Sequence, residues 1–168
     1  MKHVYLIGGT MGVGKTSACL ALKNKLDRSV FLDGDWCWSM NPFVVTEETK
    51  RMVMENICFL LNNFLQCSAY DHIIFGWVMH EQTIVEDILS RLRLDGCKVH
   101  AISLICDAET LERRISGDIA AGLRTQDDLA RSLARLPLYE RLFTHKLDVS
   151  RLTPEETAEQ ILALCKSS

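Results

Sequence analysis

Residues 9–16, Gly-Thr-Met-Gly-Val-Gly-Lys-Thr, decide the fold of this chain. They place four free positions between Gly9 and the triplet at 14–16, after an apolar run and before an expected helix. Glycines let backbone N–H groups approach phosphate oxygens, because no Cβ stands in the way. The helix that we expect from Lys15 adds the partial positive charge of its N-terminus at the same place. The pattern therefore predicts a binding site for a nucleoside triphosphate.

The side chains at the end of this loop have distinct expected roles. Lys15 reaches the β- and γ-phosphates, and the Thr16 hydroxyl ligates Mg²⁺, so that ATP and Mg²⁺ are the expected cofactors. The alternative is a glycine-rich turn that binds nothing, which the flanking strand and helix disfavour. The cofactor-binding residues that we expect from the loop are Gly9, Met11, Gly12, Val13, Gly14, Lys15, Thr16 and Ser17.

Length and composition restrict the class of protein. The 168 residues suit one domain, residues 1–168, and 48% hydrophobic with 24% charged residues is ordinary for a soluble globular protein. A net charge of −3 provides no basic field, so nucleic acid is not an expected partner. No apolar run approaches the roughly 20 residues that cross a bilayer, so no membrane partner is expected either.

Seven scattered cysteines without a Cys-x-x-Cys pair favour reduced thiols in a cytoplasmic protein. The sequence does not indicate the oligomeric state of the protein.

Strand and helix patterns alternate from one end of the chain to the other. Apolar runs predict strands at 4–7, 29–32, 72–75, 98–105 and 146–149. Helical spacing and capping residues predict helices at 15–26, 46–67, 82–94, 107–115, 125–143 and 153–165. Alternation of this kind favours a parallel sheet with helices on both faces, in which ligands gather at the carboxyl ends of the strands.

Two aspartates follow the second expected strand, on the same edge of the sheet as the loop at 9–16. Phosphoryl transfer needs a metal to neutralise the phosphates and a group that orients the acceptor oxygen. We expect Asp33 to hold Mg²⁺ through water and Asp35 to accept the proton of an acceptor hydroxyl. The alternative is an Asp-Gly turn with a solvated neighbour. No aspartate closes the third apolar strand, so Asp33 is the candidate for the second metal-binding group.

The chain resembles a family of small phosphate-loop kinases that includes shikimate, gluconate and adenylyl-sulfate kinases. Residues 32–35, Leu-Asp-Gly-Asp, look like the Asp-Gly-Asp of gluconate and adenylyl-sulfate kinases. Residues 135–140 look like the Arg-x-Pro-x-Tyr segment of shikimate kinases, whose arginine binds the substrate carboxylate. Residues 148–156 are similar to the ending that these kinases use beside the adenine ring. The resemblance implies an α/β fold of three layers, with a five-stranded parallel sheet and a small lid at about 116–124.

The same resemblance assigns roles to several arginines. It makes Arg124 the lid residue that closes on the transferred phosphoryl group, and Arg114 or its neighbour Arg113 the cover of the adenine. It also places Arg151 at the nucleotide and Arg135 at the acceptor. The alternative for residues 113, 114 and 124 is a solvated helix face that pairs with Glu109, Glu112 and Asp118 at helical spacing.

Aromatic residues follow two expected strand ends on the acceptor side. Trp36, Trp38 and Trp77 are candidates for a wall against a ring-bearing acceptor, although aromatic residues near strand ends more often belong to the core. His80 is a further candidate, because a neutral imidazole can orient a hydroxyl. Residues 75–80 depart from the glycine-rich signature of shikimate kinases, so the acceptor is not identified. The substrate residues expected in this part of the site are Asp33, Asp35, Trp36, Trp77 and Arg135.

The leading hypothesis is a phosphotransferase that moves the γ-phosphoryl group of ATP to a hydroxyl of a small molecule. Its catalytic residues are Lys15, Asp35 and Arg124. The partners are then ATP and the small-molecule acceptor. One alternative is a nucleotide-binding ATPase or switch without an acceptor, for which the sequence offers no water-positioning residue. Another is a binding module whose acceptor site has decayed.

Overall fold

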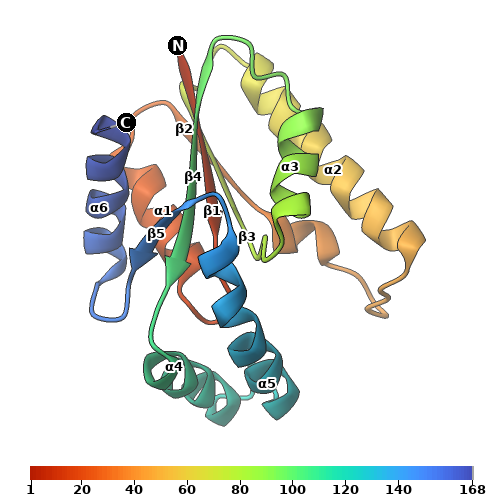
Figure 1. Ribbon diagram of the computed structural model, residues 1–168. Helices are drawn as coiled ribbons and strands as arrows, with labels where there is room; N and C mark the ends of the chain where they lie inside the picture. Colours follow the sequence, from red (N-terminus) through yellow and green to blue (C-terminus); the bar gives the residue numbers. More distant parts are fainter. Residues whose placement is uncertain (168) are drawn as a thin grey trace.

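Five parallel strands form one sheet in the order β2-β3-β1-β4-β5 in the computed structural model, which describes residues 1–167 (Figure 1). The central strand β1 hydrogen-bonds to β3 on one side and to β4 on the other. The strands are β1 (Lys2–Gly8), β2 (Ser29–Asp33), β3 (His72–Trp77), β4 (Cys97–Ile105) and β5 (His145–Asp148). The predicted parallel sheet is therefore confirmed, with each expected strand in place.

Six α-helices and two short 3₁₀ helices connect these strands. The helices are α1 (Lys15–Lys25), α2 (Glu47–Gln66), α3 (Gln82–Arg91), α4 (Ala108–Ala120), α5 (Gln126–Arg135) and α6 (Pro154–Lys166). The 3₁₀ helices are η1 (Gly34–Trp38) and η2 (Leu136–Arg141). Within residues 1–167, none of these helices has both the length and the apolar character of a membrane span.

The alternation of side chains along β1 supplies two separate hydrophobic cores. Val4 and Leu6 belong to a core that α2 and α3 cover, whereas Tyr5 and Ile7 belong to a core that α1 and α6 cover. Figure 1 shows these two helix pairs on opposite faces of the sheet. The three-layer arrangement follows directly from a central strand that is apolar on both faces.

Short polar residues fix the starts of four helices where the sequence predicts them. Thr46, Thr125 and Thr153 each form a reciprocal capping box, and the Asp107 carboxylate accepts a hydrogen bond from the backbone of Thr110. Each such cap contributes about 1 kcal/mol to helix stability. The positions of α2, α4, α5 and α6 along the chain are thus set locally.

The segment at 116–124 differs from the expectation. Helix α4 does not end near Ile115 but continues to Ala120, and a short turn then leads into α5. The backbone N–H of Leu123 bonds to the Asp118 carbonyl, and the Asp118 carboxylate accepts a hydrogen bond from Arg124. The segment that we expect to form a lid is therefore the end of α4 and the turn before α5, and Figure 1 shows these two helices beyond the carboxyl ends of the strands.

Two further helix ends fall earlier than expected. Helix α3 ends at Arg91 rather than Leu94, and α5 ends at Arg135 rather than near Phe143. In the second case the chain continues as η2, because Pro137 has no N–H group with which to extend an α-helix.

Candidate active site

A cleft of about 1100 Å³ opens where the carboxyl ends of the strands meet the pair α4 and α5. It brings together most of the residues that the sequence singles out. Those that line it are Met11, Gly12, Val13, Gly14, Lys15, Thr16, Ser17, Asp33, Asp35, Trp77, Arg114, Arg124 and Arg135.

The loop at 9–16 has a backbone shape that only glycine fits easily. Gly12 has a φ of +85°, and a Cβ at this position would lie 2.6 Å from Cγ1 of Ile115 in α4. Gly14 occupies the N-cap of α1, where no described side chain bonds to the helix end. The unpaired N–H groups of the first turn of α1 therefore border the cleft, an arrangement that suits a phosphate.

Lys15 is held in the loop by its own backbone. Its Nζ donates a hydrogen bond to the Thr10 carbonyl at 3.0 Å. Burial lowers the pKa of Lys15 from 10.5 to about 8, and the nearby carboxylates of Asp35 and Asp33 oppose this shift only in part. The Lys15 side chain is half-buried and lines the cleft, where its ammonium group can contact phosphate oxygens.

Thr16 and Asp33 form the pair of oxygen groups expected at a magnesium site. The Thr16 hydroxyl donates to Oδ2 of the buried Asp33 at 2.9 Å, and Oδ1 of Asp33 accepts from the backbone of Asp35 at 2.9 Å. Mg²⁺ binds hard oxygen groups such as these, usually together with phosphates and water. Both residues therefore fit the ion that their positions predict.

Asp35 lies between charged neighbours and an aromatic ring. Burial and the neighbouring Asp33 raise its pKa, while Lys15, a hydrogen bond from Trp77 and Arg124 act in the opposite direction. A carboxylate with a raised pKa accepts a proton more readily.

The position of the Trp77 ring depends on Gly34. A Cβ at Gly34 would lie 2.4 Å from Cγ of Trp77, so the ring occupies the space that any other residue would fill. The glycine of the Asp-Gly-Asp stretch thus admits the indole beside the second aspartate.

Two arginines of α4 and its following turn border the cleft in different ways. Arg114 donates to the Val13 carbonyl at 2.8 Å, and so braces the phosphate loop from α4. Nε of Arg124 donates to the Asp118 carboxylate at 2.9 Å, an ion pair with one of the acids that the alternative named, although it joins a turn to α4 rather than positions at helical spacing. Arg124 nevertheless lines the cleft, so the pair orients it there rather than removing it.

Sequence reasoning missed the residues that join α5 to the phosphate loop. The buried Thr10 hydroxyl lies 2.9 Å from both the hydroxyl and the carbonyl of Ser132, and the Ser132 hydroxyl also donates to the Met11 carbonyl. Thr10 occupies a free position of the loop pattern, and Ser132 lies 122 residues away in the chain.

The acceptor side of the cleft contains polar groups without partners. Nδ1 of His80 is buried and has no hydrogen-bond partner among the described residues. Burial and the nearby Arg135 lower the pKa of His80, so its imidazole is neutral near pH 7. Arg135 lines the cleft, and its side chain forms no ion pair or hydrogen bond within residues 1–167.

Three of the expected site residues do not line the cleft. Gly9 is buried beneath the loop, where a Cβ would lie 2.7 Å from Val13. Trp36 is 55% exposed and packs edge-on against Phe31, so Trp38 and Trp77 are the tryptophans of the cleft wall. Arg151 is exposed in the turn after β5, where residues 149, 152, 154 and 157 line the cleft instead.

Four cleft residues come from stretches that the sequence did not mark. Phe43 and Val45 lie in the connection to α2, Lys50 lies in α2 and Ile84 lies in α3. Apolar residues in a connection carry no sequence signal that separates a ligand contact from chance exposure.

The sheet order, the glycine loop before α1 and the Thr16–Asp33 pair define a phosphate-loop nucleotide-binding fold. The chain belongs to the AAA domain family, whose sequence profile matches residues 6–126.

The chain is also similar to individual proteins. It is 41% identical over 69 residues to the shikimate kinase of Streptococcus gordonii, a match that covers 38% of this chain and 43% of that enzyme. The chain therefore matches less than half the length of this relative.

Solved structures resemble the whole chain at lower identity. The tunicamycin resistance protein of Deinococcus radiodurans has a TM-score of 0.71 at 19% identity, over 98% of this chain and 96% of that one. A gluconokinase from Sinorhizobium meliloti has a TM-score of 0.68 at 15% identity, over 98% and 94%. A shikimate kinase from Acinetobacter baumannii, in complex with shikimate, has a TM-score of 0.66 at 21% identity, over 99% and 94%. These likenesses confirm the predicted fold, and together with the match to the Streptococcus gordonii shikimate kinase they confirm the resemblance to small phosphate-loop kinases.

Proposed function

We propose that the protein transfers the γ-phosphoryl group of ATP to a hydroxyl of a small molecule. One observation carries the proposal: the Asp33 carboxylate accepts hydrogen bonds from the Thr16 hydroxyl and from the backbone N–H of Asp35, and Asp35 lines the same cleft as Lys15. A nucleotide site alone needs no second acid at this place. The names of the relatives, which include shikimate kinase and gluconokinase, support the same class of reaction.

The nucleotide side of the cleft would bind ATP through charged side chains and through backbone N–H groups. The loop amides and the first turn of α1 receive the phosphates, and Lys15 contacts the β- and γ-phosphates. Arg114 and the apolar Val149 and Leu152 line the cleft and would contact the base, whereas Arg151 lies outside the lining. When bound, Mg²⁺ neutralises phosphate charge, and Thr16 and Asp33 are the residues that would hold it.

The transfer itself needs one proton acceptor. The acceptor hydroxyl oxygen forms a bond to the γ-phosphorus, and the bond from this phosphorus to the bridging oxygen of ADP breaks. The hydroxyl proton passes to the Asp35 carboxylate, whose raised pKa favours its capture. Lys15 and Arg124 stabilise the charge on the transferring group, since both line the cleft beside it.

A nucleotide hydrolase or switch without an acceptor is the alternative. Two observations disfavour it: the cation of Arg135 has no side-chain partner within residues 1–167, and His80 retains a buried nitrogen without one. Both residues line the cleft, and both suit an acceptor with hydrogen-bonding or anionic groups. The seven free cysteines support the cytoplasm as the compartment of the reaction.

A transfer screen tests the proposal. The protein would be incubated with Mg²⁺ and γ-labelled ATP against shikimate, gluconate, other sugars and acids, nucleosides, and aminoglycoside and phenicol drugs. Asp35→Asn should lower transfer by about 10²- to 10⁴-fold while leaving ATP affinity unchanged. Asp95→Asn, at an exposed turn, is the matched control. Equal transfer by the Asp35→Asn protein, or hydrolysis that no acceptor stimulates, would contradict the proposal.

A further inference from the structure

We propose that the acceptor carries an apolar ring, which packs on a wall formed by Trp38, Phe43 and Val45 at the mouth of the cleft. This inference rests on the proposed function and names the chemical class of its second substrate. We call these three residues the acceptor wall. They all line the cleft, on the side formed by η1 and the connection to α2.

The acceptor wall exposes apolar surface that the protein itself leaves uncovered. Phe43 is 67% exposed and Val45 is 52% exposed, although both line a cleft. The rings of Trp38 and Phe43 lie 5.7 Å apart and tilted by 53°, so they form one continuous aromatic surface. Exposed apolar surface that gathers in a cleft marks a binding site more often than apolar residues scattered singly.

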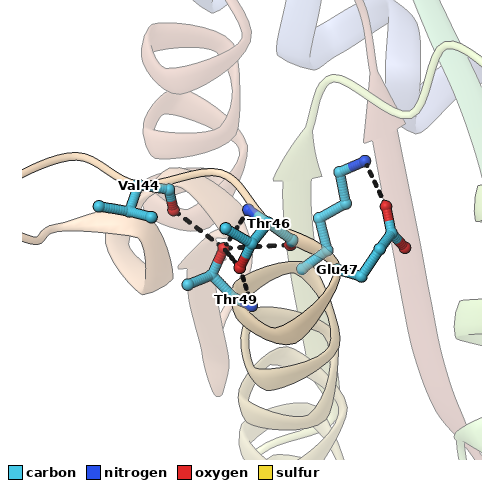
Figure 2. Close-up of polar contacts among 5 residues, drawn as sticks. Val44, Thr46, Glu47 and Thr49 are labelled. Carbon is cyan, nitrogen blue, oxygen red and sulfur yellow. Dashed lines mark hydrogen bonds and ion pairs between the residues drawn. The ribbon is translucent and has the colours of Figure 1, made fainter.

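The connection that carries the wall is fixed rather than loose. The Thr49 hydroxyl donates to the Val44 carbonyl at 2.9 Å and takes part in the capping box with Thr46 (Figure 2). Phe43 and Val45 line the cleft whereas Val44 between them does not, as the alternation of an extended chain requires. A surface that is held in place before the ligand arrives loses less conformational entropy on binding.

The polar groups of the same half of the cleft show which way the acceptor would lie. Asp35 and the hydrogen-bonded Trp77 mark the end that receives the hydroxyl, and Arg135 and His80 supply further polar contacts. Trp38 of the acceptor wall belongs to η1 together with Asp35, and Ile84 of α3 adds a further apolar group to the cleft lining. An acceptor with polar groups alone would leave the wall facing water, so the lining as a whole suits an amphipathic molecule.

A fluorescent probe tests the wall without knowledge of the acceptor. The probe is 8-anilinonaphthalene-1-sulfonate, which joins apolar rings to an anion and becomes fluorescent in apolar sites. It would be titrated into the intact protein, Phe43→Ser, Val45→Ser and the control Phe143→Ser. Phe143 is 84% exposed but lies outside the cleft lining. Thermal unfolding would be recorded for each variant, together with calorimetric binding of Mg²⁺ and a non-hydrolysable ATP analogue.

The expected result is a single class of probe sites on the folded protein. Phe43→Ser should weaken probe binding by about tenfold and Val45→Ser by less, because changes of this size in apolar pockets act on that scale. Phe143→Ser should leave probe binding unchanged, and none of the three should alter affinity for the ATP analogue. Equal affinity in Phe43→Ser, or no binding to the intact protein, would overturn the inference. Failure of the ATP analogue to bind would instead refute the proposed function.

Discussion

The nucleotide half and the acceptor half of the cleft differ in how many of their polar side chains already have hydrogen-bond partners within the protein. On the nucleotide half, Lys15 bonds to the loop backbone, Thr16 bonds to Asp33, and Arg114 bonds to the carbonyl of Val13. On the acceptor half, Arg135 and Nδ1 of His80 have no such partners in the part of the chain that the structure describes, and Phe43 and Val45 line the cleft while largely exposed.

This difference indicates how each half would recognise its ligand. The nucleotide half is a network in which each contact supports another, which suits a ligand with invariant phosphates. The acceptor half has polar and apolar groups that await a partner, which suits one particular molecule. Changes in the first half should therefore reduce every activity, whereas changes in the second should alter acceptor use alone.

Removal of the loop lysine should have the largest effect. Lys15→Ala removes the cation nearest the transferring charge and should lower transfer by about 10²- to 10³-fold, with weaker ATP binding. Lys50→Ala is the matched control, because Lys50 lines the acceptor half and pairs with the exposed Glu47. Steady-state kinetics and calorimetry would measure both. Equal loss of ATP affinity in the two variants would contradict the division of the cleft.

Addition of a methyl group at Gly34 should impair the acceptor half of the cleft while leaving the nucleotide half intact. Gly34→Ala places a Cβ against the Trp77 ring and should displace the indole that bonds to Asp35. We expect about 10²-fold slower transfer, as for other small displacements of reacting groups, with ATP affinity retained. Overpacking should also destabilise the fold by about 1–3 kcal/mol. Gly117→Ala, where nothing lies within 4 Å of the added Cβ, is the control. Transfer at the native rate would show that the ring position is unimportant.

Loss of the Ser132 hydroxyl should loosen the tie between α5 and the phosphate loop. Ser132→Ala leaves the Met11 carbonyl without this donor and should lower the free energy of unfolding by about 1–3 kcal/mol. Ser90→Ala, whose hydroxyl bonds only within its own exposed helix, should change it by less than about 0.5 kcal/mol. Denaturant unfolding with and without ATP measures both. A result for Ser132→Ala no larger than that for Ser90→Ala would contradict the tie.

Proton uptake by the protein on nucleotide binding should report the protonation state of Lys15. Its folded pKa of about 8 lies below the ordinary value of 10.5, so the unfolded chain binds more protons in this window and stability from this group rises with pH. Phosphates raise the pKa again, so nucleotide binding between these pH values should take up a fraction of a proton. Calorimetry in buffers of different ionisation enthalpy measures the uptake, and Lys15→Ala should abolish it. Equal uptake by that variant would assign the proton to another group.

The strands and helix starts were predictable because they depend on local chemistry. The apolar runs fixed β1 to β5, and the capping threonines Thr46, Thr125 and Thr153 fixed three helices. The phosphate loop was predictable for the same reason, since its pattern and its geometry occupy the same eight residues.

Contacts between distant segments were not predictable. The Thr10–Ser132 bond and the brace from Arg114 to Val13 join residues more than a hundred positions apart. The continuation of α4 past Gly117 depends on the turn that Asp118 and Arg124 close together. Phe43 and Val45 became part of the site only because the fold turned their connection toward the cleft.

Because α1 packs against α6, the two hydrophobic cores should form at different times during synthesis and folding. The core under α2 and α3 uses residues 4–99 and is available early in synthesis. The core under α1 also requires Ala158 and Ile161 of α6, and Lys25 of α1 pairs with Glu159. Contacts over such separations in sequence form late, because a long loop must close first. During translation α1 thus lacks its packing partners from α6 until that helix has been synthesised, so the core behind the phosphate loop is completed after the core under α2 and α3.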